Sequence, residues 1–180
     1  MKKIVLFLLL FTVLIINRSF SQSWINIDIG DSGCSAYLPD EPDWELNYAE
    51  DSSLVWVGEV SDGDIFYGII CVEFSEPFPD DAARQDLINV AESYLDYLKG
   101  EFKIVSTTGY LTGFTMESDK EATGISDSWV DNEGNPWAVK TWIDHYNMAV
   151  LYIYSSPDVP LDENKNYFFN SFRFPELGEE

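Results

Sequence analysis

The sequence predicts an α+β fold, an α/β/α sandwich around a mainly antiparallel, twisted sheet. The run from Ile65 to Phe74 is apolar in both of its alternating sets of side chains, so a strand here needs cover on both faces. A buried helix is the alternative for such a run, but its content of Ile, Val, Phe and Tyr favours a strand. The chain also has one long helical pattern, at residues 81–99, with strand patterns before and after it.

The N-terminal residues 1–21 have the pattern of a secretory signal peptide. Two lysines precede an apolar run from Ile4 to Ile16, and small residues lie at the predicted cleavage site after Ser21. A transmembrane helix is the alternative, but it needs about 20 apolar residues. We therefore expect an exported protein, periplasmic or secreted, that keeps no stable membrane anchor after cleavage.

Residues 22–174 are predicted to form a single α/β domain, followed by an acidic C-terminal tail at 175–180. The 180 residues include 32 acidic and 10 basic ones, which gives a formal net charge of −22. Such a charge repels the phosphates of nucleic acid, so we expect no nucleic-acid partner. A small ligand, a basic protein or a cation is compatible with it.

Before the central strand, four strand patterns are expected, at residues 24–29, 34–38, 44–48 and 54–60. Residues 30–33 predict a turn between the first two. The dipeptide Asp62-Gly63, between two apolar runs, is a strong hairpin signal. We expect these strands and the central one to form an antiparallel meander.

The long helix is predicted from one apolar stripe at spacings of three and four residues. Its members are Leu87, Val90, Ala91, Tyr94, Leu95 and Leu98. An Asp after Pro79 is expected to cap the first turn, and Lys99 with Gly100 to end the helix. The stripe is expected to pack on one face of the sheet, and a partner-binding groove is the alternative.

The second half of the domain is predicted to contain antiparallel strands and a short helix. The strand patterns are residues 102–106, 110–116, 128–130, 137–143 and 148–154. Polar turns at 131–136 and 144–147 join the last three as hairpins. The short helix, at 161–170, is expected on the face opposite the long helix.

Two short motifs frame the domain. The opening strand ends in Leu38-Pro39, and the closing helix contains Phe168 to Phe172, which reads Phe-Phe-Asn-Ser-Phe. With the order of elements over residues 24–174, they resemble the PsbP-like family, which includes an extrinsic subunit of photosystem II and exported bacterial proteins. The resemblance implies an α/β/α sandwich that serves as a binding or assembly module and carries no shared catalytic residues.

Candidate ligand-facing aromatic residues lie on one predicted hairpin. They are Trp129, Trp137 and Trp142, which could stack on a sugar, although buried cross-strand aromatic pairs are the alternative. Cys34 and Cys71 could form a disulfide after export, or remain two small buried thiols.

Asp131 and Glu133 are the candidate metal ligands, because this turn offers oxygen ligands around Gly134. The turn lacks the distal bidentate Glu of an EF-hand, and hairpin turns favour the same residue types, so calcium is the one cofactor considered. Asp62 and Asp64 form a second, weaker candidate.

No catalytic set stands out in the sequence. His145 is the only histidine and falls in a predicted turn, where we expect it to be solvated, and no Gly-x-Ser-x-Gly motif is present. We therefore expect an exported, non-catalytic binding or assembly module for an unknown protein or small ligand. A carbohydrate-directed hydrolase with paired carboxylates and a weak calcium-dependent module are the alternatives.

Overall fold

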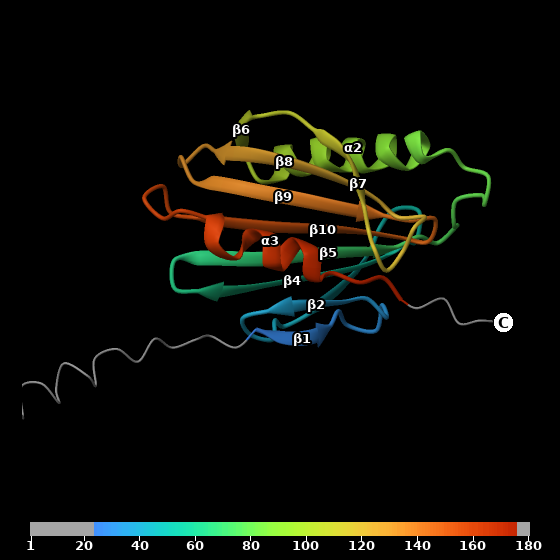
Figure 1. Ribbon diagram of the computed structural model, residues 1–180, viewed down its shortest axis with the longest axis horizontal. Helices are drawn as coiled ribbons and strands as arrows, with labels where there is room; N and C mark the ends of the chain where they lie inside the picture. Colours follow the sequence, from blue (N-terminus) through green and yellow to red (C-terminus); the bar gives the residue numbers. More distant parts are fainter. Residues whose placement is uncertain (1–23, 176–180) are drawn as a thin grey trace, which may run out of the picture.

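A computed structural model describes residues 24–175 and has an eight-stranded antiparallel sheet at its centre (Figure 1). The order across the sheet is β3-β4-β5-β10-β9-β8-β6, and β7 pairs with β8. Its strands are β3 (Glu45–Tyr48), β4 (Leu54–Asp62), β5 (Ile65–Glu73), β6 (Ile104–Thr107), β7 (Leu111–Thr115), β8 (Thr123–Asp131), β9 (Pro136–Ile143) and β10 (Asn147–Ser155). The predicted signal peptide and the tail beyond Pro175 lie outside the described residues.

β5 is the strand predicted from the apolar run, and it pairs with β4 on one side and β10 on the other. Tyr67, Ile69 and Cys71 belong to one hydrophobic core, whereas Ile70 and Val72 belong to a second core on the opposite face. The prediction of a central strand with an apolar core on each face is confirmed. The predicted hairpin before it is also confirmed, and Gly63 takes the positive φ of +59° there.

Gly68 lets the aromatic neighbours of β5 pack closely. It lies opposite Tyr152 on β10, and a Cβ atom built on Gly68 would be 2.0 Å from that ring. A side chain of any size therefore collides with Tyr152, so the sheet needs glycine at this position.

Two helices pack on opposite faces of the sheet. α2 (Arg84–Glu101) contributes Leu87, Ala91 and Leu95 to one core, and α3 (Asp162–Ser171) contributes Phe168 and Phe169 to the other. The described chain is therefore an α+β protein with a mostly antiparallel sheet. None of its helices is long and apolar enough to cross a membrane.

The predicted meander is wrong at its start, because the first two strands leave the main sheet. β1 (Ile25–Asp28) and β2 (Ser35–Leu38) form a separate two-stranded sheet and help α3 to cover one face. The reason lies in their contacts with the end of the chain. Ser35 bridges to Arg173, and the N–H of Tyr37 donates to Oγ of Ser171.

The bounds of the long helix also differ from the prediction. α2 begins at Arg84, so neither Asp80 nor Asp81 caps it, and Asp86 instead accepts a hydrogen bond from the N–H of Ala83. At the other end, Gly100 stays helical, and Lys103 takes the left-handed conformation with φ 54°. The helix therefore begins three residues and ends two residues later than predicted, and its first turn is capped from within by Asp86.

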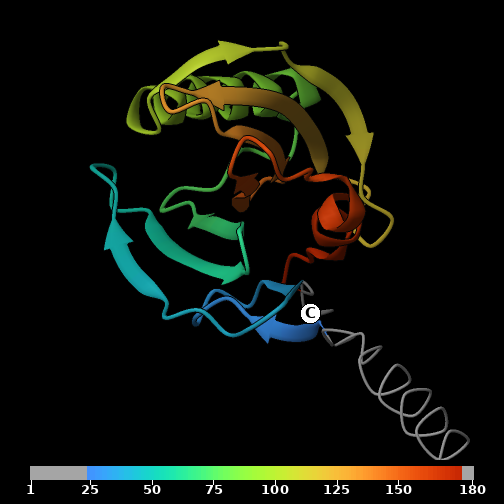
Figure 2. The ribbon, with the colours of Figure 1, turned by 90° about the vertical axis from the view of Figure 1, so that its left-hand side faces the viewer.

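α2 covers only part of its face of the sheet (Figure 2). Seven strands side by side at about 4.8 Å span roughly 29 Å, whereas a helix with its side chains is about 10–12 Å wide. The helix packs mainly on β6, β8 and β9. The prediction that this helix packs on one face of the sheet is therefore confirmed, but the helix does not extend over β3 and β4.

Candidate functional site

An open groove lies between α2 and the β3–β4 hairpin, over the part of the sheet that α2 does not cover. Its volume is about 650 Å³, within the range of small-ligand and peptide pockets. The apolar residues that line it are Tyr48, Val55, Val72, Phe74, Val90, Tyr94, Tyr97 and Met148. They come from four strands and the helix, so the groove is a property of the tertiary fold.

Tyrosines form both walls of the groove. Tyr94 and Tyr97 are three residues apart on α2, with ring centroids 6.1 Å apart, and Tyr48 stands opposite at the end of β3. Tyr48 is 70% exposed and Tyr97 60% exposed, while burial raises the pKa of the half-buried Tyr94 to about 12. Exposed tyrosine offers a flat apolar ring and a hydroxyl that tolerates water, which suits a surface that binds and releases a partner.

The loop wall of the groove is held in place by hydrogen bonds. The N–H of Ser53 donates to Oδ1 of Asp51 (3.0 Å), which lowers the pKa of that carboxyl. Beyond the loop, Ser75 donates through its N–H to Oγ of Ser53 (3.1 Å) and through its hydroxyl to the carbonyl of Asp51 (2.7 Å). Because these hydrogen bonds already fix the loop, binding of a ligand costs little conformational entropy there.

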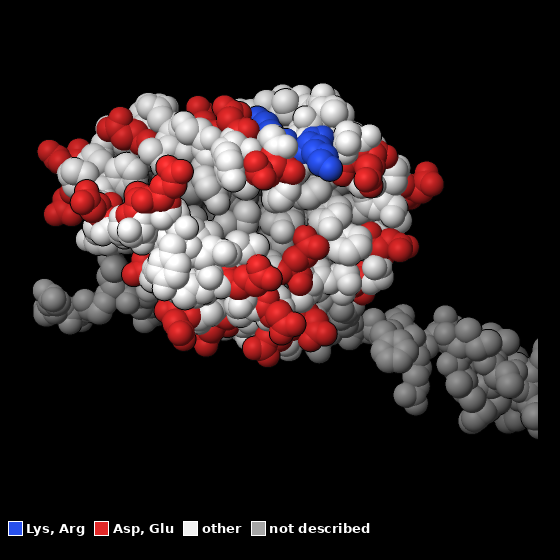
Figure 3. All heavy atoms as spheres, turned by 180° about the vertical axis from the view of Figure 1, so that it is seen from behind, with Lys and Arg blue, Asp and Glu red and all other residues white. Residues whose placement is uncertain are grey.

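The groove is acidic at its border. The charged residues that line it are Glu50 and Asp51, and no Lys or Arg lies among the described lining residues. On the face shown in Figure 3, acidic side chains surround an uncharged hollow, and the few basic side chains gather near one edge. Electrostatic attraction at this groove therefore favours a cation over an anion.

Sequence reasoning assigned Tyr94 to the buried stripe of the helix and did not single out Tyr48 or Tyr97. The structure places Tyr94 at the edge of the stripe, where it lines the groove. Two signals in the sequence pointed to this surface. A single long helix is too narrow for so many strands, and Tyr97 follows Tyr94 by three residues.

The three candidate ligand-facing tryptophans are buried. Trp129 and Trp137 are directly opposite across β8 and β9, and Trp137 stacks on Tyr154 with ring centroids 4.2 Å apart. The indole N–H of Trp142 donates to the carbonyl of Phe169 on α3 (3.1 Å). Trp137 thus forms a cross-strand aromatic stack with Tyr154, the kind of pair that the sequence left open as an alternative.

The carboxylate of Asp131 closes the β8–β9 turn. Its Oδ1 accepts the N–H groups of Glu133 and Asn135, and its Oδ2 accepts the side-chain N–H groups of Asn135 and Trp137, all at 2.9–3.0 Å. Burial alone would raise the pKa of Asp131, but these bonds outweigh it and the pKa is lowered. Both oxygens are already occupied by donors, and Glu133 beside them is exposed.

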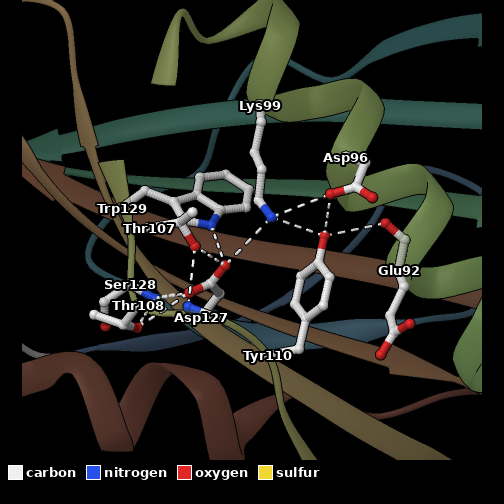
Figure 4. Close-up of polar contacts among 10 residues, drawn as sticks. Glu92, Asp96, Lys99, Thr107, Thr108, Tyr110, Asp127, Ser128 and Trp129 are labelled. Atoms are coloured by element: carbon white, nitrogen blue, oxygen red, sulfur yellow. Dashed lines mark hydrogen bonds and ion pairs between the residues drawn. The ribbon is translucent and has the colours of Figure 1, made fainter. Parts of the chain in front are cut away.

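Asp127 is the centre of a buried polar network (Figure 4). Its carboxylate accepts hydrogen bonds from the hydroxyls of Thr107 and Thr108 and from the indole of Trp129, and Nζ of Lys99 lies 3.5 Å away. Burial would raise the pKa of Asp127, but the hydrogen bonds lower it overall. The Asp127 carboxylate has partners from α2, β6 and β8, so the network links these three elements.

Cys34 and Cys71 are free thiols that lie fully buried in one core. The neighbouring Cys34 thiol, together with burial, raises the pKa of Cys71. Both cysteines are free in the structure, and their disulfide after export stays a prediction. The two thiols are neighbours in this core.

The remaining candidates lie in turns. Half-buried His145 is in the β9–β10 turn, and its carbonyl accepts the N–H of Phe78 (2.8 Å). Asp62 and Asp64 flank Gly63 in the β4–β5 hairpin. Across residues 24–175, the structure has no group of three or more His, Cys, Asp or Glu side chains placed to hold a metal ion.

No model of a known protein family matches the chain, and no curated protein matches it either. The candidate site therefore has to be interpreted from its own geometry.

Proposed function

We propose that the protein is an exported, PsbP-like binding module whose groove takes a basic segment of a partner protein. The observation that supports this is the combination, in one groove, of three tyrosine rings with a border that carries acidic charges and no basic ones. Lysine and arginine side chains have an apolar stem and a cationic end, so they match both features.

Each feature contributes to affinity in a different way. The faces of Tyr48 and Tyr97 attract cations by about 0.5–1 kcal/mol at exposed sites, and the apolar floor favours burial of aliphatic side chains. Glu50 and Asp51 add Coulomb attraction, which speeds the encounter with a positively charged partner and weakens in salt. The preferred segment therefore places Lys or Arg next to apolar residues.

The alternative of a carbohydrate hydrolase finds less support in this groove. Hydrolysis by paired carboxylates needs two groups about 5–10 Å apart that face one another across the substrate. Glu50 and Asp51 are neighbours in the chain, and Asp51 holds the loop through Ser53. The calcium-dependent alternative is weakened by the saturated carboxylate of Asp131.

A peptide library tests the proposal. We expect immobilised protein to enrich ten-residue peptides in which Lys or Arg alternates with apolar residues, and we expect their affinity to fall as NaCl is raised from 20 to 300 mM. Chemical shifts in NMR spectra should change at Tyr48, Tyr94 and Tyr97 when an enriched peptide is added. Peptides enriched without basic residues would contradict the proposal.

Variants in the groove locate the binding. The double substitution of Tyr48→Ser and Tyr97→Ser removes two exposed rings, so it should weaken binding at least tenfold without lowering the melting temperature. Glu50→Lys should weaken it further, and more at low salt than at high salt. The control is Val105→Ser, which removes an equally exposed apolar side chain (68%) outside the groove. Binding that survives the tyrosine substitutions would place the partner elsewhere.

A further inference from the structure

A second pocket lies on the opposite face of the sheet, between α3 and strands β7, β8 and β9. Its volume is about 490 Å³. The residues that determine its chemistry are Phe114, Ser126, Ser128, Lys140, Lys165 and Asn170. It shares no lining residue with the groove, so what it binds is independent of the function proposed above.

Lys140 is the unusual residue in this pocket. Lys140 is a buried residue with 6% of its surface exposed, and its Nζ lies 3.2 Å from the centre of the Phe114 ring and 4.4 Å from that of Trp142. Gly124 makes room for both rings, because a Cβ atom there would come within 2.6 Å of Trp142 and 2.9 Å of Phe114. Among the described residues, Nζ has no hydrogen bond and no ion pair.

A buried ammonium without an anionic partner is costly, and contacts with aromatic rings offset only part of that cost. The chain has 32 acidic residues, yet none pairs with Lys140 in the described structure. Burial lowers the pKa of Lys140 to about 8, and no carboxylate counteracts it. The nearest acidic residue in the lining, Asp127, directs its carboxylate to Lys99 and Trp129 on the other face.

We propose that this pocket binds a small organic carboxylate that pairs with the ammonium of Lys140. The aromatic and aliphatic walls, Phe114, Phe169 and Ala138, suit the carbon body of such a ligand. Ser126, Ser128 and Asn170 supply neutral hydrogen-bonding groups for the rest of it. The ammonium of Lys140 has no ion pair among the described residues, so it attracts anions locally on a strongly negative protein.

Binding of the carboxylate should depend on pH, because only the ammonium form of Lys140 attracts it. The elements around Lys140 contribute one other titratable side chain to the lining, Lys165 of α3, besides the Asp127 carboxylate on the far face. β7 contributes Leu111 and Phe114, and β8 contributes serines. Affinity should therefore fall as pH rises through about 8, and binding should take up protons near that pH.

Isothermal titration with defined probes tests the proposal. The probes are acetate, benzoate, succinate and glucuronate, with inorganic phosphate and chloride as anions that lack a carboxylate. We expect at least one carboxylate to bind saturably at pH 7 and to bind about tenfold or more weakly at pH 9.5. Lys140→Met, which keeps the volume of the side chain, should abolish this binding, while Lys120→Met, at an exposed position, should not change it.

A measurement on the unmutated protein covers the case in which Lys140→Met does not fold. In NMR spectra of protein labelled at the lysine side chains, saturation with the carboxylate should raise the pKa of Lys140. The proposal is overturned by the absence of carboxylate binding at millimolar concentration, by binding that survives Lys140→Met, or by phosphate binding as tightly. Covalent trapping of an aldehyde on the Lys140 amine with borohydride, in a protein that binds none of the carboxylates, would also overturn the proposal.

Discussion

Asp127 connects three parts of the molecule through a single carboxylate. It receives hydrogen bonds from β6 and from Trp129 of β8, and it faces Lys99 near the end of α2. Lys99 in turn donates to Tyr110 and Asp96, so the network continues toward the surface (Figure 4). A buried acid with this many partners contributes to stability only while it is ionised.

Asp127→Asn should lower the free energy of unfolding by about 2–3 kcal/mol at pH 7, because it removes the charge that Lys99 and the donors require. Urea denaturation followed by circular dichroism measures this. The folded pKa of Asp127 lies below its unfolded value, so its contribution is present above about pH 4 and is lost as pH falls through the folded pKa. The difference between the two proteins should therefore shrink toward pH 2. Asp64→Asn, in an exposed turn, serves as the control.

Lys140 has the opposite relation to pH. Its folded pKa, about 8, lies below the ordinary value of 10.5, so the folded protein holds this proton less tightly than the unfolded chain does. Relative to Lys140→Met, the unmutated protein should gain up to roughly 3 kcal/mol as pH rises from about 8 to 10.5. Urea denaturation of both proteins at pH 7, 8.5 and 10 measures the gain. A difference that stays constant with pH would show that Lys140 is not held in a desolvating site.

At the scale of elements, strands were more predictable than helix ends. The alternation in β5 and the Asp62-Gly63 turn are local signals, and both gave the observed strand pairing. The start of α2 depends on which acid reaches the free N–H groups, and Asp80, Asp81 and Asp86 are equally plausible from the sequence. β1 and β2 were assigned to the main sheet, because the contacts that hold them apart from it come from the end of the chain, as between Tyr37 and Ser171, 134 residues away.

Substitution of glycine by alanine should have opposite effects on stability at Gly68 in β5 and at Gly100 in α2. Gly68→Ala should lower the free energy of unfolding by about 3 kcal/mol, because the new methyl group overlaps the Tyr152 ring. Gly100→Ala, in α2 with no neighbour within 4 Å, should raise it by about 0.5–1 kcal/mol through helix propensity. Thermal denaturation of both variants provides the comparison. Equal effects would mean that Tyr152 moves aside at little cost.

At the scale of the whole molecule, both candidate pockets arise from the mismatch between a wide sheet and two narrow helices. The groove beside Tyr97 and the pocket around Lys140 lie where each helix stops covering strands. The sequence indicated the number of strands and helices but not how the helices sit across them. In the sequence, Lys140 has the place of a polar residue in an alternating strand pattern, which predicts an exposed side chain. Its burial could therefore not be predicted without the position of α3.

The net charge of −22 predicts a general response to salt. Repulsion among 32 acidic side chains destabilises the folded state, so raising NaCl from 10 to 300 mM should increase the melting temperature by about 3–5 °C. Differential scanning calorimetry measures the shift, and choline chloride should give the same result because screening does not depend on the cation. A much larger rise with calcium at equal ionic strength would favour the calcium-dependent alternative.

The bridge between Ser35 and Arg173 joins β2 to the segment after α3, so the two ends of the described chain close one core together. This core therefore cannot be completed until Arg173 has left the ribosome. The pairing of β5 with β4 is local in sequence, whereas the Cys71 face depends on contacts with α3 and the β1–β2 hairpin that span most of the described chain. Because contacts of high sequence separation form slowly, we expect this face of β5 to be covered late in folding.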